Sequence, residues 1–268
     1  MDSRSGAIVG FGEVRHVMDM FDPRKFMISM WVDPVEQGKG VGSAIYDGLA
    51  KELEDLGAMV VWTMNREDLP RHREFFLKRG FQEKMRDWES RLDLSTVDLS
   101  KFQGYFEKML REGITFTTLA EERRHGAGSL RKLHELVQLI AADMPREVAF
   151  TPLSYEQWES LEFKSPRLLP EGYVIAKNGP DFVGLSVVYR NEKDPQNLTQ
   201  GDTGVRREYR GRGIATALKL KVIEFAQKNG YKSVKTWNDS TNAAMLAVNT
   251  KLGFKRQVGW IRMEKLLT

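Results

Sequence analysis

The hydrophobic and polar positions of this chain follow one order of elements that occurs twice. In its first occurrence, residues 26–32 (FMISMWV) form an apolar run of strand length, followed by a polar turn and a glycine-rich stretch. Over residues 41–53 apolar side chains return every four positions, which predicts a helix with Gly57 as its stop. A strand over residues 58–64 (AMVVWTM) and a second helix ending at Gly80 follow. This order predicts a mixed α/β fold.

The second occurrence lies 173 residues further along the chain, where residues 210–254 align without a gap with residues 37–81. Glycine makes up only 23 of the 268 residues, so four glycine pairs at one offset indicate a true internal repeat. The matched pairs include Gly38 with Gly211, Gly40 with Gly213, Gly57 with Gly230, Gly80 with Gly253, Val32 with Val205, Thr63 with Thr236, Asn65 with Asn238, Lys78 with Lys251 and Phe81 with Phe254.

The two copies differ in what precedes the glycine-rich stretch. The first copy begins at residues 7–10, which match residues 181–184 one position out of register. It therefore lacks roughly the first 65 residues of the repeating unit. Before the second stretch the pattern predicts three strands and two helical segments, namely strands over 114–119, 173–177 and 182–189 and helices over 130–142 and around 155–162.

Residues 99–112 (LSKFQGYFEKMLRE) separate the copies and predict a short amphipathic connecting helix with Gly113 as its stop. We therefore expect a partial domain over residues 1–98 and a complete domain over residues 113–268. The length of 268 residues also favours two domains, because it exceeds the usual size of a single hydrophobic core. In each copy we expect a mainly antiparallel sheet that splays where the glycine-rich stretch follows its central strand.

The composition excludes several kinds of chemistry. The chain has no cysteine, and therefore no disulfide, thiolate metal site or cysteine nucleophile. Its four histidines show no HExxH or paired spacing, so we expect no catalytic metal. The net charge of +4 comes from 41 cationic and 37 anionic side chains, without a basic run interleaved with aromatic residues. Nucleic acid is therefore not an expected partner.

No apolar run approaches the ~20 residues that a membrane span requires. Residues 1–6 (MDSRSG) lack the apolar core of a signal sequence. We therefore expect a cytoplasmic protein without a membrane partner, either a monomer or a homodimer.

Each glycine-rich stretch joins a strand to the N-terminus of a helix, where unpaired backbone N–H groups and the helix dipole favour an anion. Gly211 and Gly213 allow the backbone to approach a phosphate closely, and Arg210 and Arg212 add positive charge at the rim. The second stretch is therefore a candidate phosphate site.

Two well-known phosphate-binding patterns do not fit. Neither copy has the GxxxxGK[ST] pattern of a P-loop. The GxGxxG pattern of a dinucleotide fold would need a third glycine where Ser43 and Thr216 stand, and no acidic residue follows a second strand at the required distance. Both copies instead share the pattern [QR]-x-x-G-x-[GA], as QGKGVG over residues 37–42 and RGRGIA over residues 210–215.

This hexapeptide, with a strand before it and a helix after it, resembles the coenzyme A pyrophosphate loop of the GNAT superfamily of acyl-CoA N-acetyltransferases. A strand and the segment N-x-x-M-x-x-x-N-x-x-L-G-F over residues 242–254 then follow, as in that superfamily. The resemblance covers nearly the whole chain, and the tandem arrangement is similar to that of mycothiol-synthase-like double acetyltransferases. It implies acetyl-CoA as the co-substrate.

The resemblance also implies individual roles. The backbone at residues 203–205 would pair with the pantetheine arm and polarise the thioester carbonyl, which places Val205 at the reacting centre. Asn242 would touch the pantetheine or the diphosphate, and its place at a helix start equally suits a cap. The cofactor-binding residues implied are Thr203, Val205, Arg210, Gly211, Arg212, Gly213, Ile214, Ala215, Thr216 and Asn242, with Gln37, Gly38, Lys39, Gly40, Val41 and Gly42 in the first copy.

Catalysis in this superfamily is direct attack of a neutral amine on the thioester, which suits a chain without cysteine. In many members a tyrosine four residues before the final glycine gives the leaving thiolate its proton; here that position is Asn249. An amide supplies no proton, so the general acid lies elsewhere, is a water, or is dispensable. Asn249 lies in a helical stripe that should be apolar, so it is either buried with partners or faces the cofactor cleft, and we favour the cleft.

The sequence offers several candidates for the general base and for the acceptor pocket and does not choose between them. Asp202, Glu208 and Tyr209 flank the loop, but charged residues next to a turn are more often simply solvated. Tyr189 and Trp237 could line the acceptor pocket, although aromatic strand residues more often belong to a core.

The first copy has Leu69 and Phe76 at the positions of Asn242 and Asn249, so we expect the domain over residues 1–98 to be non-catalytic and the domain over 113–268 to be catalytic. The first copy would then contribute a wall, a dimer surface or stability. We expect an N-acetyltransferase that acts on the amine of a small molecule. The alternatives are a protein N-acetyltransferase, or a non-catalytic acetyl-CoA sensor or scaffold.

Overall fold

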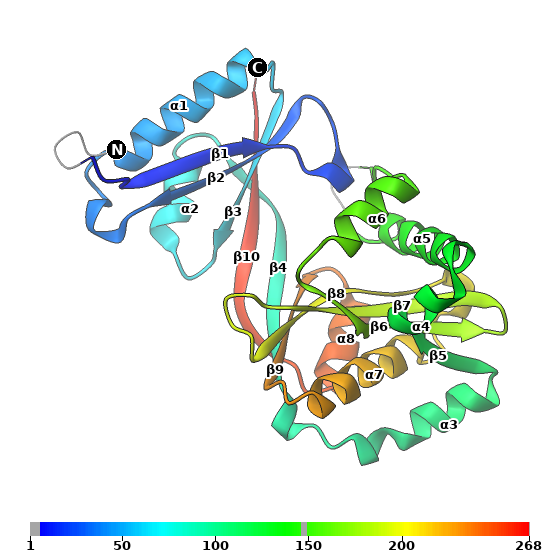
Figure 1. Ribbon diagram of the computed structural model, residues 1–268. Helices are drawn as coiled ribbons and strands as arrows, with labels where there is room; N and C mark the ends of the chain where they lie inside the picture. Colours follow the sequence, from blue (N-terminus) through cyan, green and yellow to red (C-terminus); the bar gives the residue numbers. More distant parts are fainter. Residues whose placement is uncertain (1–5, 146–148, 268) are drawn as a thin grey trace. The chain divides into compact units, whose positions relative to one another are not determined.

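The computed structural model describes residues 6–145 and 149–267, and the chain divides into two compact units (Figure 1). Unit 1 takes in the chain up to Asp87, a short stretch before Pro152, and the residues from Val258 onward. Unit 2 takes in Trp88–Glu147 and Pro152–Gln257. Both units combine helices with strands, which confirms the expected mixed α/β class.

Unit 1 is built mainly from the first copy of the repeat. Strand β1 (Gly10–Arg15) is antiparallel to β2 (Lys25–Val32), and β2 is parallel to β3 (Val60–Arg66). Helix α1 (Val41–Asp55) packs on β1 and β2, and α2 (Pro70–Leu77) packs on β3. The 3-10 turns η1 and η2 cover Met18–Met20 and Pro34–Glu36. The core of the unit comprises Phe26, Ile28, Tyr46, Leu49, Leu53, Val61, Phe76, Phe81, Ile261 and Met263.

Unit 2 contains the second copy together with the elements that precede it. Its strand order is β4-β9-β8-β7-β6-β5. The strands are β4 (Gln82–Asp93), β5 (Ile114–Thr118), β6 (Leu168–Asn178), β7 (Asp181–Arg190), β8 (Asn197–Val205) and β9 (Ser233–Asp239). The helices are α3 (Gln103–Arg111), α4 (Leu119–Glu122), α5 (Ala127–Ala142), α6 (Tyr155–Phe163), α7 (Ile214–Lys228) and α8 (Ala243–Lys251), with 3-10 turns η3 (Leu94–Thr96), η4 (Leu99–Phe102), η5 (Arg123–His125) and η6 (Arg207–Tyr209).

Helices cover both faces of the unit 2 sheet. Helix α7 packs on β6, β7 and β8, and its side chains Leu218 and Val222 belong to one core. Helices α5 and α6 lie on the other face, where Leu136 and Trp158 join a second core with alternate residues of β6 and β7 (Figure 1). The stretch predicted to connect the copies is helical: η4 and α3 pack against α7, and Gly113 follows α3 with a φ of +73°.

The last strand of each copy extends into the unit of the other copy. Strands β4 and β10 (Lys255–Leu266) are both 12 residues long and correspond at the offset of the repeat. Strand β10 is nevertheless antiparallel to β3 in unit 1, from Trp260 opposite Arg66 to Leu266 opposite Val60. The end of β4, from Trp88, lies in unit 2 next to β9. The domain boundaries expected at residues 98 and 113 remain a prediction.

Candidate active site

The expected splay of the central strands occurs in both units. In unit 2, β8 and β9 run parallel and pair only from Asn197 opposite Ser233 to Thr199 opposite Lys235. In unit 1, β2 and β3 pair only from Lys25 opposite Val60 to Met27 opposite Trp62. Beyond these three pairs each strand continues without the other, so one edge of β8 and one edge of β2 are left open for a ligand.

The glycines of the repeat adopt the same backbone conformation in both copies. The φ angles are +81° at Gly38 and +75° at Gly211, and +90° at both Gly40 and Gly213. The helix-ending glycines of both copies are also left-handed. Because side chains disfavour this region, the repeated glycines are explained by backbone geometry.

Helix α7 begins directly after the second glycine-rich turn, with Gly213 as its N-cap. The first intrahelical bond runs from the Ala217 amide to the Gly213 carbonyl, at 3.0 Å. The amides of Ile214, Ala215 and Thr216 therefore have no acceptor within the helix. The described first turn contains no side-chain cap and no acidic residue. This N-terminus is suited to a pyrophosphate.

The arginines of the second turn are paired with carboxylates at its rim. Arg210 donates to the Val205 carbonyl at 3.0 Å and to Asp143 at 2.5 Å. Arg207 also donates to Asp143, and hydrogen bonds from these guanidinium groups lower the pKa of its carboxyl. Arg212 donates to Glu112 at 2.7 Å, and Lys108 of α3 donates to the Arg212 carbonyl at 2.8 Å.

The edge of β8 that faces away from β7 carries a free donor at the expected place. The Arg206 amide donates to Val183 of β7, while the Val205 carbonyl accepts from the Arg210 side chain. Since N–H groups alternate in direction along a strand, the Val205 amide points to the open edge. The Thr203 hydroxyl lies 2.9 Å from the Ser186 hydroxyl of β7. Thr203 and Val205 thus lie in the part of β8 that is not paired with β9.

Asn249 is 2% exposed and lies in α8. Its side-chain Nδ2 donates to Oδ1 of Asn238, in β9, at 2.6 Å. Its Oδ1 is buried and has no hydrogen-bond partner among the described residues. A buried acceptor without a partner is costly, so this oxygen is a place where a ligand group can donate. Asn242 caps α8 by accepting from the Met245 amide at 3.2 Å.

A buried amine lies beneath the open part of β8. Lys219 of α7 is 2% exposed, and burial lowers its pKa to about 7. Its Nζ lies 3.4 Å from Gln200 Oε1, and Gln200 donates in turn to the Ser186 hydroxyl at 3.2 Å and to the Val187 carbonyl at 2.5 Å. The network continues to Thr203. It holds β7 and β8 together where their register shifts, between Ser186 and Val188.

The first copy repeats the backbone of this arrangement with other side chains. Gln37 donates to the Val32 carbonyl at 3.3 Å, as Arg210 does to Val205. Lys39 pairs with Glu36 at 3.0 Å. Helix α1 follows with Gly40 as its left-handed N-cap, and Val41 and Gly42 in its first turn. Phe76, in the position of Asn249, is buried among aromatic rings in the core of unit 1.

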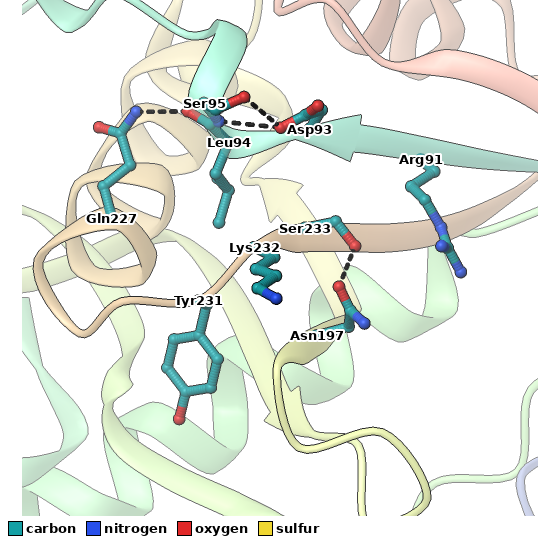
Figure 2. A pocket seen from close by; sticks show the side chains of 9 residues that line it. All are labelled: Arg91, Asp93, Leu94, Ser95, Asn197, Gln227, Tyr231, Lys232 and Ser233. Atoms are coloured by element: carbon teal, nitrogen blue, oxygen red, sulfur yellow. Dashed lines mark hydrogen bonds between the residues drawn. The ribbon is translucent and has the colours of Figure 1, made fainter.

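A depression in unit 2, shown in Figure 2, lies away from the open edge of β8. It sits where β8 and β9 begin and are still paired, at the opposite ends of these strands from the glycine-rich turn. Gln227 donates to the Leu94 carbonyl at 2.8 Å, and Ser233 donates to Asn197 at 2.5 Å. These bonds tie its polar side chains to the surrounding backbone and strands, and the depression lies far along β8 from the glycine-rich turn, so we assign it no catalytic role. It is lined by Arg91, Asp93, Leu94, Ser95, Asn197, Gln227, Tyr231, Lys232 and Ser233.

The described residues contain neither a helix that could span a membrane nor a cluster of metal ligands. No helix in 6–145 or 149–267 is long and apolar enough to cross a membrane. Within the same ranges, no three His, Asp or Glu side chains gather as metal ligands.

The structure brings the residues predicted for the second copy to one region, the end of β8, the turn and the first turn of α7, with Asn249 on the neighbouring α8. Sequence reasoning missed the carboxylates Asp143 and Glu112, which pair with the arginines of the turn. It also missed Lys219. Only the polar character of Lys219 within an apolar stripe could have indicated it, because its partner Gln200 lies on another element.

Comparison with known families defines the class of this protein. A model of the acetyltransferase (GNAT) family matches residues 2–81 and 133–254, which is more than half of the chain. The chain therefore belongs to the GNAT acetyltransferase family and is an N-acetyltransferase of that family, as its motifs predicted. Family membership implies the use of acetyl-CoA.

Individual relatives agree with this class. Over 61 residues the chain is 41% identical to an uncharacterized N-acetyltransferase, MJ1207, of Methanocaldococcus jannaschii, a match that spans 22% of this chain and 27% of that protein. Over 257 residues it is 22% identical to the mycothiol acetyltransferase of Amycolatopsis mediterranei, covering 94% of this chain and 78% of that protein.

Solved structures show the tandem fold. A tandem GNAT protein from the clavulanic acid biosynthesis pathway superposes with a TM-score of 0.68 at 19% identity, over 91% of this chain and 75% of that chain. The expected tandem arrangement is thereby confirmed.

Proposed function

We propose that this protein moves the acetyl group of acetyl-CoA directly to an amine of a small molecule, and that unit 2 carries the reaction. The observation that carries the proposal is the combination, at one place in unit 2, of an open β8 edge, a left-handed glycine turn and an uncapped helix N-terminus.

The residues at this place fit acetyl-CoA. A Cβ added at Gly211 would have no atom within 4 Å, so the turn leaves open space on its outer side. The amides of residues 214–216 would hold the pyrophosphate, and Arg210 and Arg212 would exchange their carboxylate partners for phosphate oxygens. The Val205 amide would donate to the thioester carbonyl, whose oxygen becomes negative as the amine attacks. Acetyl-CoA supplies the activated acyl group when bound.

Asn249 suits a role toward the sulfur end of the cofactor. Its buried Oδ1 accepts from no described residue, and the pantetheine arm offers amide N–H groups that could donate to it. An amide at this position orients the arm without protonating the thiolate, which leaves as CoASH after taking a proton from the attacking amine or from water.

The first copy supports a different role for unit 1. It repeats the turn, but the buried Phe76 occupies the place of Asn249. We infer that residues 37–42 bind acetyl-CoA weakly or not at all, and that unit 1 serves stability or assembly.

The test is release of CoASH from acetyl-CoA with a panel containing spermidine, glucosamine and a lysine-containing peptide. Because the chain has no cysteine, a thiol reagent reports CoASH without background from the protein. We expect saturable release with a small amine and a product heavier by one acetyl group. Turnover of the peptide alone would make it a protein N-acetyltransferase, and binding of acetyl-CoA without any turnover would indicate a sensor.

A further inference from the structure

A cluster of titratable side chains lies on the face of the unit 2 sheet opposite α7, and no step described above uses it. It consists of Glu162 in α6, Tyr189 in β7, Tyr173 in β6 and Asp202 in β8. The Tyr189 hydroxyl donates to both oxygens of Glu162, at 2.8 and 3.1 Å.

The cluster is anchored at the irregular point of β8. Between the pairs Ser186–Thr203 and Val188–Gln200, the single residue Val187 lies opposite both Gly201 and Asp202, which is a β-bulge. The ring of Tyr189 lies over Gly201, since a Cβ there would come within 2.5 Å of its Cε2 atom. The bulge sits between the last β8–β9 pair at Thr199 and the open residues Thr203 and Val205, so the cluster adjoins the expected position of the thioester.

Tyr173 completes the cluster. It is 2% exposed and belongs to the core on this face of the sheet. It pairs across the sheet with Val187, opposite the bulge. Burial raises the pKa of Tyr173, and the charges of Tyr189, Glu162 and Asp202 raise it further, which places its hydroxyl near these groups. The oxygen of such a hydroxyl can accept a hydrogen bond from an ammonium group.

The electrostatics of the cluster favour a cation. Burial raises the pKa of the Glu162 carboxyl, and the charge of Asp202 raises it further. The hydrogen bond from Tyr189 and the charges of Arg123 and Arg167 act in the opposite direction without reversing the shift. A positive charge placed between Glu162 and Asp202 would relieve their repulsion and stabilise both as carboxylates.

We propose that Glu162, Asp202 and Tyr173 form the acceptor site for a primary ammonium group, and that Glu162 is the general base that deprotonates it. This assignment rests on the proposed function, because the amine must lie next to acetyl-CoA. Tyr189 is a positioning residue that fixes the Glu162 carboxylate over the bulge.

The proposed transfer moves two protons from the ammonium group and exchanges a C–S bond for a C–N bond. A carboxylate oxygen of Glu162 removes one proton from R–NH3+, and the freed lone pair attacks the thioester carbon. The C–N bond forms as the C–S bond breaks, and the second amine proton goes with the thiolate to give CoASH. Glu162 returns its proton to water through the exposed side of Asp202. A glutamate whose pKa is raised by burial is a better base for an ammonium than an ordinary glutamate.

The first experiment measures binding without turnover. Saturation-transfer NMR with n-butylammonium, in the presence of CoA, is compared with n-butanol as the neutral analogue. We expect a signal for n-butylammonium with the wild-type protein, at least about fivefold weaker with Glu162→Gln, and none for n-butanol. Glu159→Gln is the matched control. Like Glu162, Glu159 lies in α6 and accepts a hydrogen bond from a tyrosine, here Tyr155 at 2.7 Å, but it lies outside the cluster.

The second experiment measures the pH profile with the panel amine of highest kcat/KM. In the wild type, kcat/KM for the amine should rise as Glu162 deprotonates, with an apparent pKa above that of an ordinary glutamate. Glu162→Gln should lose about 100-fold in kcat/KM together with this acidic limb, while KM for acetyl-CoA stays within twofold. Tyr173→Phe should raise KM for the amine several-fold, because the ammonium group loses an acceptor, while KM for acetyl-CoA stays within about twofold.

The outcomes separate this inference from the proposed function. If an amine is acetylated but Glu162→Gln keeps both the rate and the n-butylammonium signal, the acceptor assignment is wrong and the function stands. If n-butylammonium binds in a Glu162-dependent way but no amine is acetylated, the cation site stands and the function fails. If the wild type neither binds n-butylammonium nor acetylates an amine, both are overturned.

Discussion

The two copies of the repeat share a backbone and differ at the few side chains that matter for chemistry. Their glycine turns have nearly the same φ angles, their helices start and stop at corresponding residues, and both strand pairs separate after three residues. In unit 1, Tyr46 and Phe76 occupy the positions that Lys219 and Asn249 hold in unit 2. In the first copy these two positions belong to an aromatic core. In the second copy they hold buried polar side chains, which lower the stability of the folded state. Conserved backbone geometry therefore does not by itself indicate which copy is active.

The largest expected effect comes from the turn glycines. Gly211→Val should lower kcat/KM for acetyl-CoA about 100-fold, because the side chain enters the space where a phosphate approaches the backbone. Gly38→Val is the matched control and should change it less than about threefold. Both sites have positive φ and no atom within 4 Å of an added Cβ. Gly213 and Gly40 are less well matched, since a Cβ at Gly213 would lie 3.2 Å from Tyr105. Calorimetric binding of CoA that is equal in both variants would contradict the assignment of the cradle.

The buried amine should make unit 2 sensitive to pH. The pKa of Lys219, lowered by burial to about 7 from an ordinary 10.5, means that the unfolded state binds more protons between these values. The stability of the wild type should therefore rise with pH between about 7 and 10.5, with a slope approaching ~1.4 kcal/mol per pH unit.

Lys219→Met should abolish this dependence and stabilise the protein by about 2 kcal/mol at pH 7, after the loss of the Gln200 contact. Urea denaturation at pH 7, 8.5 and 10 measures it. Tyr46→Phe, at the corresponding position of unit 1, leaves Lys219 in place and should keep the wild-type dependence in the same pH range. Equal slopes for wild type and Lys219→Met would indicate that the amine is charged or solvated.

Asn249 should affect turnover more than folding. Asn249→Ala should lower kcat about tenfold, because the pantetheine arm loses an acceptor. The melting temperature should fall by only a few degrees, since a single bond to Asn238 is lost. Phe76→Ala in unit 1 should do the reverse, with a large loss of stability and an unchanged kcat per folded molecule. A large loss of stability with normal kinetics for Asn249→Ala would make it a structural asparagine.

The smallest effect concerns the helix starts. Asn242 caps α8, whereas Leu69 stands at the N-cap of α2 without a side-chain bond. Asn242→Ala should cost about 1 kcal/mol of stability, and Leu69→Asn should add a similar amount to unit 1. Thermal denaturation reports both. If Asn242→Ala also raised KM for acetyl-CoA more than about fivefold, the side chain would contact the cofactor as well as cap the helix.

The sequence alone was sufficient for the local features of the site. The spacing of apolar residues predicted strands, helices and their glycine stops, because these depend on contacts within a few residues. The hexapeptide RGRGIA predicted the turn and the helix N-terminus for the same reason. The carboxylate partners of the arginines and the cluster of Glu162, Tyr173, Tyr189 and Asp202 could not be predicted, because their members come from separate elements that only the packed sheet brings together.

The tertiary structure also decided which unit each last strand joins. Strands β4 and β10 correspond within the repeat, so the pattern of each suits an edge beside β3 or beside β9 equally well. Pairing of strands is a long-range interaction, and its register and partner follow from the burial of one face rather than from local preference. The sequence by itself determined two copies of one glycine-rich turn. Only the folded chain placed β10 beside β3, the end of β4 beside β9, and a partly buried glutamate against Tyr189 of β7.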